Sequence, residues 1–278
     1  MRRRAFVASG FALLATGACA AVRSKDRLVI KGTMEQGSLA LGYADPKATV
    51  KIDGQAVRLS PEGVFAFGFA FDQTKPSLID VIWSDGAAES QSYTPTVRQY
   101  EIQRVNGLPQ NTVTPPPEVL ERIKREAGEI YMARQRDMPG SDFLSGFDWP
   151  APGIESGVFG SQRIDNGVPM APHFGVDMAA PAGTPIRAPA DGTVSLSADH
   201  YLNGGFTLID HGQGVSTSYL HQSKRLVKDG DVVKRGQKIG EIGQTGRATG
   251  PHLHWAMNWF EVKLDPSRSA RKAKPDPL

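Results

Sequence analysis

Two short histidine motifs lie in the carboxyl-terminal half of the sequence. His173 and Asp177 are four residues apart in His-Phe-Gly-Val-Asp, which places both side chains on one face of a strand or a helical turn. His252 and His254 are two residues apart in Pro-His-Leu-His-Trp and share one face of a strand. A hydrolytic zinc ion takes three imidazole or carboxylate ligands and keeps one position for water. Together with His221, these residues supply such a set with two imidazoles to spare.

Each motif alone is weak evidence, because structural histidines also occur at these spacings. The surrounding sequence adds an ordered series of short segments. In chain order they are Trp149-Pro150, Phe159-Gly160-Ser161-Gln162-Arg163, Pro172 to Asp177, Ala188 to Val194, Asp210-His211-Gly212, Tyr219-Leu220-His221 and Gly246 to His254. This series resembles the lysostaphin-type zinc metallopeptidases, and the resemblance covers residues 149–262.

The resemblance implies a role for each of the five residues. His173, Asp177 and His254 would bind one Zn²⁺ per chain, and His221 and His252 would form the catalytic pair. An ion held by two neutral imidazoles and one carboxylate keeps net positive charge, which lowers the pKa of a bound water. We expect His252 to act as the base. For His221, oxyanion stabilisation and protonation of the leaving amine stay open.

The resemblance also implies a function. A family member of this kind is expected to be a zinc metalloendopeptidase that hydrolyses peptide cross-links or stem peptides of bacterial peptidoglycan during cell-wall remodelling. One alternative is a non-hydrolytic interaction protein, or a regulator of amidases, in the cell wall. A second alternative is a secreted protease that acts on protein targets. Divisome or other cell-wall proteins are candidate partners of the amino-terminal region.

The expected fold is mostly β, with an amino-terminal β-sandwich, a linker helix and a β-rich catalytic domain of antiparallel sheets. Residues 27–105 alternate apolar and polar side chains, and turn pairs such as Asp53-Gly54 punctuate them, which favours an immunoglobulin-like sandwich. Phe65, Phe67, Phe69 and Phe71 are expected on one face of a single strand, as part of its core. Residues 149–262 show strands and glycine turns again.

A proline-rich linker and a helix are expected over residues 106–148. Three consecutive prolines at 115–117 favour an extended, stiff segment before the helix. Apolar residues then follow at helical spacing from Pro117 until Met138-Pro139-Gly140. This apolar face either packs on one of the domains, or the helix or its tail crosses the active groove and restrains it. Residues 263–278 are expected to form a polar tail.

The first twenty residues, 1–20, have the features of an export signal: a positive start, an apolar run and small residues at its end. The segment also resembles a twin-arginine signal, and Gly17-Ala18-Cys19 resembles a lipobox, so Cys19 is either a lipidated membrane attachment or part of a removed peptide. We expect a periplasmic or cell-envelope location. Arg2, Arg3 and Arg4 account for the formal charge of +3, and the remaining 29 basic and 29 acidic residues balance. This balance argues against a nucleic-acid partner.

Overall fold

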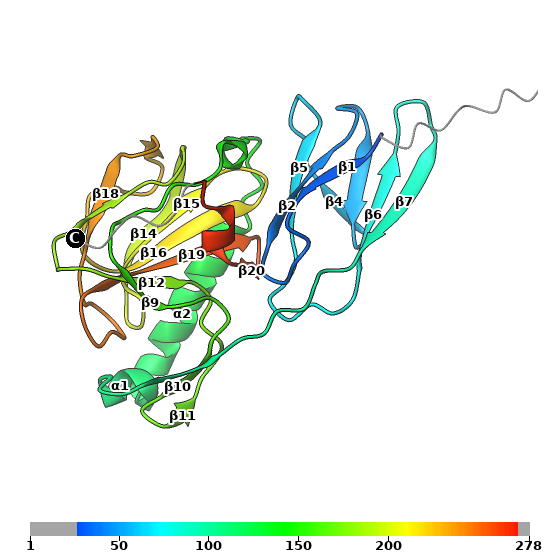
Figure 1. The fold of residues 1–278 in the computed structure, drawn as a ribbon. Helices are drawn as coiled ribbons and strands as arrows, with labels where there is room; N and C mark the ends of the chain where they lie inside the picture. Colours follow the sequence, from blue (N-terminus) through cyan, green and yellow to red (C-terminus); the bar gives the residue numbers. More distant parts are fainter. Residues whose placement is uncertain (1–26, 272–278) are drawn as a thin grey trace, which may run out of the picture.

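The computed structural model describes residues 27–271 and is mostly β, as predicted (Figure 1). The expected export signal and Cys19 lie outside the described residues. None of the helices in the described range is long and apolar enough to span a membrane.

The amino-terminal part consists of two small antiparallel sheets that enclose one hydrophobic core. One sheet has the order β1-β2-β5 and the other the order β4-β3-β6-β7. Their bounds are β1 (Val29–Gly32), β2 (Leu39–Tyr43), β3 (Thr49–Ile52), β4 (Gln55–Val57), β5 (Val64–Gly68), β6 (Ser77–Ile82) and β7 (Ala88–Tyr93). The turn predicted at Asp53-Gly54 joins β3 to β4, with φ of 49° and 82° at its two residues. Asp and Gly tolerate these left-handed angles, which a tight hairpin requires.

The phenylalanine series is only partly as expected. Phe65, Phe67 and Phe69 are fully buried in the sandwich core. Strand β5 ends at Gly68, so Phe71 leaves this face and instead packs against Tyr100 and Phe174, at 5.8 and 5.0 Å between ring centroids. The fourth ring therefore joins the sandwich to the segment that carries His173.

The chain between the two β-rich parts contains a strand and a short helix where an extended linker was expected to begin. Strand β8 (Ile102–Val105) pairs in parallel with β10 (Gln162–Asp165), which also pairs with β11 (Val168–Pro169). A short helix, α1 (Gln110–Val113), follows. The end of the region expected to belong to the sandwich therefore forms a sheet with the carboxyl-terminal part of the protein.

Helix α2 (Pro117–Arg134) begins at the proline predicted to start it and ends four residues before Met138. Its buried residues are Glu126 and Ala133, and Ala133 packs with Phe206 and Leu208. Glu126 accepts a hydrogen bond of 2.8 Å from the backbone N–H of Tyr201. The helix therefore packs on the outside of the large sheet. Leu120 and Tyr131 of the predicted apolar face stay exposed, so the sheet covers only part of that face. The idea that the helix or its tail crosses the groove is wrong, because no residue of 117–140 lines the cavity around the two histidine motifs.

A ten-stranded sheet forms the carboxyl-terminal part, with the main order β17-β14-β15-β16-β19-β12-β9. A short 3₁₀ turn, Asp142–Ser145, precedes it. The strands are β9 (Ile154–Gly157), β12 (Val176–Ala179), β13 (Pro185–Arg187), β14 (Gly192–His200), β15 (Gly204–Asp210), β16 (Val215–Arg225), β17 (Val232–Val233), β18 (Lys238–Ile242), β19 (His252–Trp259) and β20 (Val262–Leu264). Central side chains such as Tyr219 and Trp255 are fully buried. This rigid layer carries the histidine motifs.

The segment expected to be a polar tail is folded as far as the description reaches. Leu264 is fully buried at the end of β20, and a 3₁₀ turn, Pro266–Ser269, follows. Asp265 caps this turn and forms a 2.9 Å ion pair with Arg98 of the sandwich side. Apolar and capping residues thus extend the fold beyond residue 262.

Candidate metal centre and catalytic pocket

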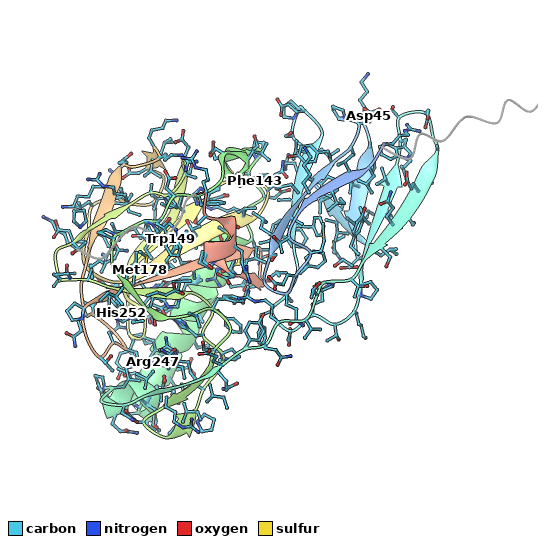
Figure 2. All side chains as sticks on the ribbon, viewed as in Figure 1. Asp45, Phe143, Trp149, Met178, Arg247 and His252 are labelled. Carbon is cyan, nitrogen blue, oxygen red and sulfur yellow. The ribbon has the colours of Figure 1, made fainter. Side chains whose placement is uncertain are left out.

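The strand register brings the two histidine motifs together. Strands β12 and β19 are antiparallel, and Asp177 lies directly opposite His254. Strand β16 pairs with the other edge of β19, where Leu220 lies opposite His254, so His221 follows immediately. Residues separated by up to 81 positions in the sequence therefore meet within one pocket, which Figure 2 places far from the sandwich tip marked by Asp45.

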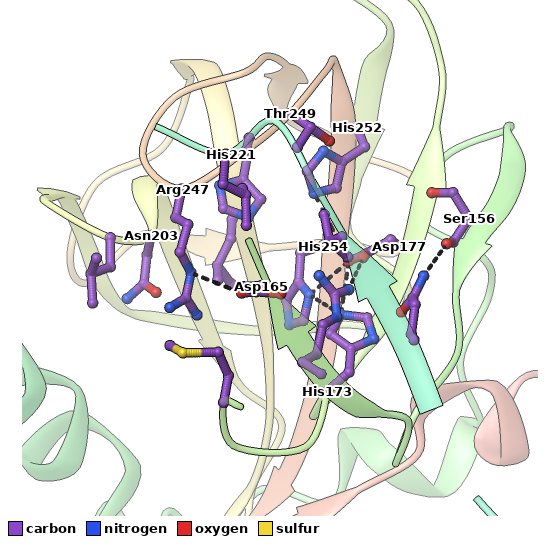
Figure 3. Close-up of a pocket in the computed structure, with 18 of the residues that line it drawn as sticks. Ser156, Asp165, His173, Asp177, Asn203, His221, Arg247, Thr249, His252 and His254 are labelled. Carbon is purple, nitrogen blue, oxygen red and sulfur yellow. Dashed lines mark hydrogen bonds and ion pairs between the residues drawn. The ribbon is translucent and has the colours of Figure 1, made fainter. Parts of the chain in front are cut away.

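Three ligand atoms converge at the centre of this pocket. His173 Nε2 lies 2.9 Å from Asp177 Oδ1 and 2.9 Å from His254 Nδ1, and the last two atoms are 2.8 Å apart (Figure 3). Zinc bonds of about 2.0–2.1 Å in a tetrahedron place neighbouring ligand atoms roughly 3.3 Å apart. The observed triangle is slightly smaller, and two nitrogens and one carboxylate oxygen are a suitable donor set. The group can hold one metal ion.

Contacts behind the three ligands orient them. His173 Nδ1 lies 3.1 Å from the carbonyl oxygen of Val158, which fixes the proton on Nδ1 and leaves the Nε2 lone pair for a metal. Arg163 Nη2 donates to Asp177 Oδ2, the oxygen that does not face the two imidazoles. This ion pair holds the carboxylate plane in position.

Two glycines make room for the ligands. A Cβ atom on Gly175 would lie 2.5 Å from His254 Nε2 and 2.7 Å from the carbonyl oxygen of Trp255. A Cβ atom on Gly157 would lie 2.5 Å from Asp177 Oδ2. Carbon atoms do not approach this closely, so any larger residue at either position would displace a ligand.

The protonation of the group suits a cation. Burial alone would raise the pKa of Asp177, but the charges and hydrogen bonds of His173 and His254 hold its pKa well below its ordinary value. Burial lowers the pKa of His254 to about 4. Near neutral pH the group therefore offers an ionised carboxylate and an unprotonated imidazole, the forms that bind metal.

His221 and His252 lie next to this group, with ring centroids 4.7 Å apart. His221 Nδ1 lies 2.8 Å from the carbonyl oxygen of Thr245, and His252 Nδ1 lies 2.8 Å from that of Gly250. Each ring therefore donates through Nδ1 and presents Nε2 as an acceptor. His252 Nε2 is 3.9 Å from Asp177 Oδ1. Burial and the neighbouring histidines lower the pKa of His221 to about 3, so this imidazole is neutral near pH 7.

The backbone of His221 is in the left-handed region, with φ of 63°. Residues other than glycine rarely adopt this conformation, and such strain is concentrated at functional sites. It occurs within β16, whose pairing with β15 and β18 shifts register nearby. The irregularity directs the ring towards the pocket.

The pocket has a volume of about 460 Å³ and is lined by all five residues identified from the sequence. Further lining residues come from a segment that no sequence motif had marked as part of the site: Gln103, Val105 and Leu108, in and after β8. Arg163, the last residue of the Phe159–Arg163 segment, contacts Asp177 from behind the metal ligands. Asp165 and Arg247 also line the pocket, although nothing in their spacing singles them out.

Comparisons with known proteins give a consistent result. The sequence model of peptidase family M23 matches residues 171–266. Peptidoglycan DD-endopeptidase ShyA of Vibrio cholerae is 50% identical over 88 residues, which cover 32% of this chain and 20% of ShyA. ShyC of the same organism is 52% identical over 83 residues, which cover 30% of this chain and 19% of ShyC. The match thus spans about a fifth of the length of these curated relatives.

A solved structure matches much more of the chain. The crystal structure, from Pseudomonas aeruginosa and described as that of an M23 peptidase, is 31% identical and has a TM-score of 0.68. The match covers 85% of this chain and 95% of the Pseudomonas chain, so it includes the amino-terminal part as well as the large sheet.

Proposed function

The chain belongs to peptidase family M23, as its resemblance to the lysostaphin-type metallopeptidases predicted, and from this premise we propose that it is a zinc-dependent endopeptidase acting on peptidoglycan. The observation that carries the proposal is the convergence of three ligand atoms beside two further imidazoles in one open pocket. Such a site has the parts that metal-assisted amide hydrolysis needs.

We assign the metal ligands to His173, Asp177 and His254, with one Zn²⁺ per chain. Two imidazoles and a carboxylate are a donor set typical of catalytic zinc sites, which keep a fourth position open. When bound, the ion would activate water and polarise the scissile carbonyl. The zinc identity rests on this donor set and on the family.

The two remaining histidines would move the protons. His252 Nε2 lies beside Asp177 Oδ1, so it is placed to accept a proton from the attacking water. His221 is neutral and also presents Nε2 as an acceptor, so it delivers a proton to the leaving amine only after receiving one. A histidine accepts and returns a proton readily once a developing charge raises its pKa.

The substrate follows from the relatives and from the sequence. The matched relatives are named peptidoglycan DD-endopeptidases, and the expected export signal would deliver this chain to the periplasm or cell envelope, where peptidoglycan lies. We therefore propose cross-links or stem peptides of peptidoglycan as the substrate. Protein partners of the sandwich and membrane attachment through Cys19 stay predictions.

Digestion of purified Gram-negative sacculi tests this function. Zinc-loaded protein and a chelated sample are incubated in parallel, and the released muropeptides are analysed by mass spectrometry. We expect cross-linked dimers to decrease and monomers to increase only with zinc. An unchanged profile from folded, zinc-bound protein would contradict the proposal and favour the non-hydrolytic alternative. Cleavage of casein with inert sacculi would instead favour a protease for protein targets.

A further inference from the structure

A second charged pair lines the pocket outside the metal group. Arg247 Nε lies 4.0 Å from Asp165 Oδ2, which is an ion pair but too long for a hydrogen bond (Figure 3). The Arg247 guanidinium donates no hydrogen bond to any residue of the range 27–271. Its side chain is 31% exposed and lines the pocket.

The backbone that carries Arg247 is held firmly. Its N–H donates to the carbonyl oxygen of Leu202 at 2.8 Å, and Gly246, with φ of 71°, lies against the same turn. Thr245 donates through Oγ1 to the carbonyl oxygen of Gln222 at 2.9 Å, and its own carbonyl oxygen accepts the His221 Nδ1 bond. The loop that orients His221 therefore also places Arg247, two residues later, on the same side of the pocket.

The charges of the pocket favour an anion at this position. Its charged lining residues are two arginines, Arg163 and Arg247, and two aspartates, Asp165 and Asp177. Arg163 already donates to Asp177, which leaves Arg247 as the pocket arginine whose guanidinium donates no hydrogen bond within residues 27–271. A divalent cation would leave the pocket with a net charge of about +2 when its histidines are neutral. Burial and the nearby Arg163 lower the pKa of Arg247 and Asp165 raises it, while the guanidinium stays protonated.

We propose that Arg247 is a specificity-determining residue that binds a free carboxylate of the substrate, next to the scissile amide on the side of the leaving amine. The proposal rests on the proposed peptidase function. Arginine is suited to this task because its planar donors match the two oxygens of a carboxylate. The chemistry recognised is a peptide whose residue at the leaving amine carries an uncompensated carboxylate.

The test compares two synthetic peptides that differ only in a carboxylate or a carboxamide at that residue. Hydrogen bonds to charged groups contribute about 1.5–3 kcal/mol, so wild-type protein should prefer the carboxylate peptide roughly 10- to 100-fold in kcat/KM. Arg247→Gln should abolish this preference, and Arg247→Lys should retain part of it. The control Arg187→Gln, on an exposed arginine outside the pocket, should leave the preference unchanged.

Equal cleavage of both peptides by wild-type protein, or an unchanged preference in Arg247→Gln, would overturn the proposal. Thermal unfolding checks that the variants are folded. If Arg247→Gln is not folded, the reduced preference expected of Arg247→Lys makes the same test. Cleavage of neither peptide would count against the peptidase function itself. In that event, the role of Arg247 is tested by equilibrium binding of the same two peptides. Wild-type protein should bind the carboxylate peptide with the lower Kd, and Arg247→Gln should bind both peptides equally.

Discussion

Substitution of Gly175 by alanine should remove metal binding by steric displacement of one ligand. The added Cβ would lie 2.5 Å from His254 Nε2, whereas ordinary contacts begin at 3.4 Å. The imidazole would therefore have to move by about 0.9 Å, well beyond the tolerance of about 0.2 Å for a metal–ligand distance. The added Cβ cannot avoid the imidazole by shifting away from it, because the backbone carbonyl oxygen of Trp255 would lie only 2.7 Å from the same Cβ.

The expected loss exceeds the 10- to 100-fold change in metal affinity that follows loss of a contact behind a ligand, because here the ligand itself moves. The assay is competition for Zn²⁺ with a chromophoric chelator. Gly128→Ala is the matched control, since its Cβ meets nothing within 4 Å and it lies within helix α2. A Kd for zinc within twofold of wild type, in folded Gly175→Ala protein, would refute the reasoning. If this variant fails to fold, Gly157→Ala makes the same test at Asp177.

Three further substitutions probe other parts of the site and the core. Arg163→Met should lower the free energy of unfolding of metal-free protein by about 3 kcal/mol, because the buried Asp177 carboxylate loses its ion-pair partner; urea unfolding in chelator that changes by less than 1 kcal/mol would contradict this. His252→Ala should abolish peptide hydrolysis while zinc stays bound, and near-normal turnover would remove His252 from the mechanism. Burial raises the pKa of Asp210 to about 6, above its unfolded value, so its ionisation destabilises the fold as pH rises from 4 to 6. Asp210→Asn should therefore gain up to about 3 kcal/mol of stability at pH 7 and almost none at pH 4; equal gains at both pH values would show another cause.

The part of the site that could be predicted from sequence is the part that depends only on the two-residue repeat of side-chain direction along one strand. The two-residue spacing of His252 and His254 fixes a common face on any strand, and the prediction needed no knowledge of neighbours. The pairing of Asp177 with His254 depends on register between distant strands, so it followed only from the family resemblance. The left-handed backbone of His221 could not be assigned from residue type, because only a few per cent of non-glycine residues adopt it, even though histidine is enriched among them.

The fold was predictable where neighbouring residues determine it, as in the turn at Asp53-Gly54 and in strands that alternate apolar and polar side chains. It was not predictable where a short segment finds a distant partner. Four-residue β8 pairs with β10 across more than fifty residues, and no pattern within β8 itself specifies that partner. The same contact brings Gln103 and Val105 to the pocket. The ion pair of Arg247 with Asp165 is likewise a contact between residues far apart in the sequence, so it could not be predicted before the fold was known.

The central claim is that the five residues divide into three metal ligands and two proton-transferring histidines. Zinc content per chain, measured by mass spectrometry after dialysis for wild type and five single alanine variants, tests it most directly. We predict one zinc per chain in wild type, His221→Ala and His252→Ala, and almost none in His173→Ala, Asp177→Ala and His254→Ala. Full zinc content in a folded His173, Asp177 or His254 variant, or its loss in a folded His221 or His252 variant, would contradict the account.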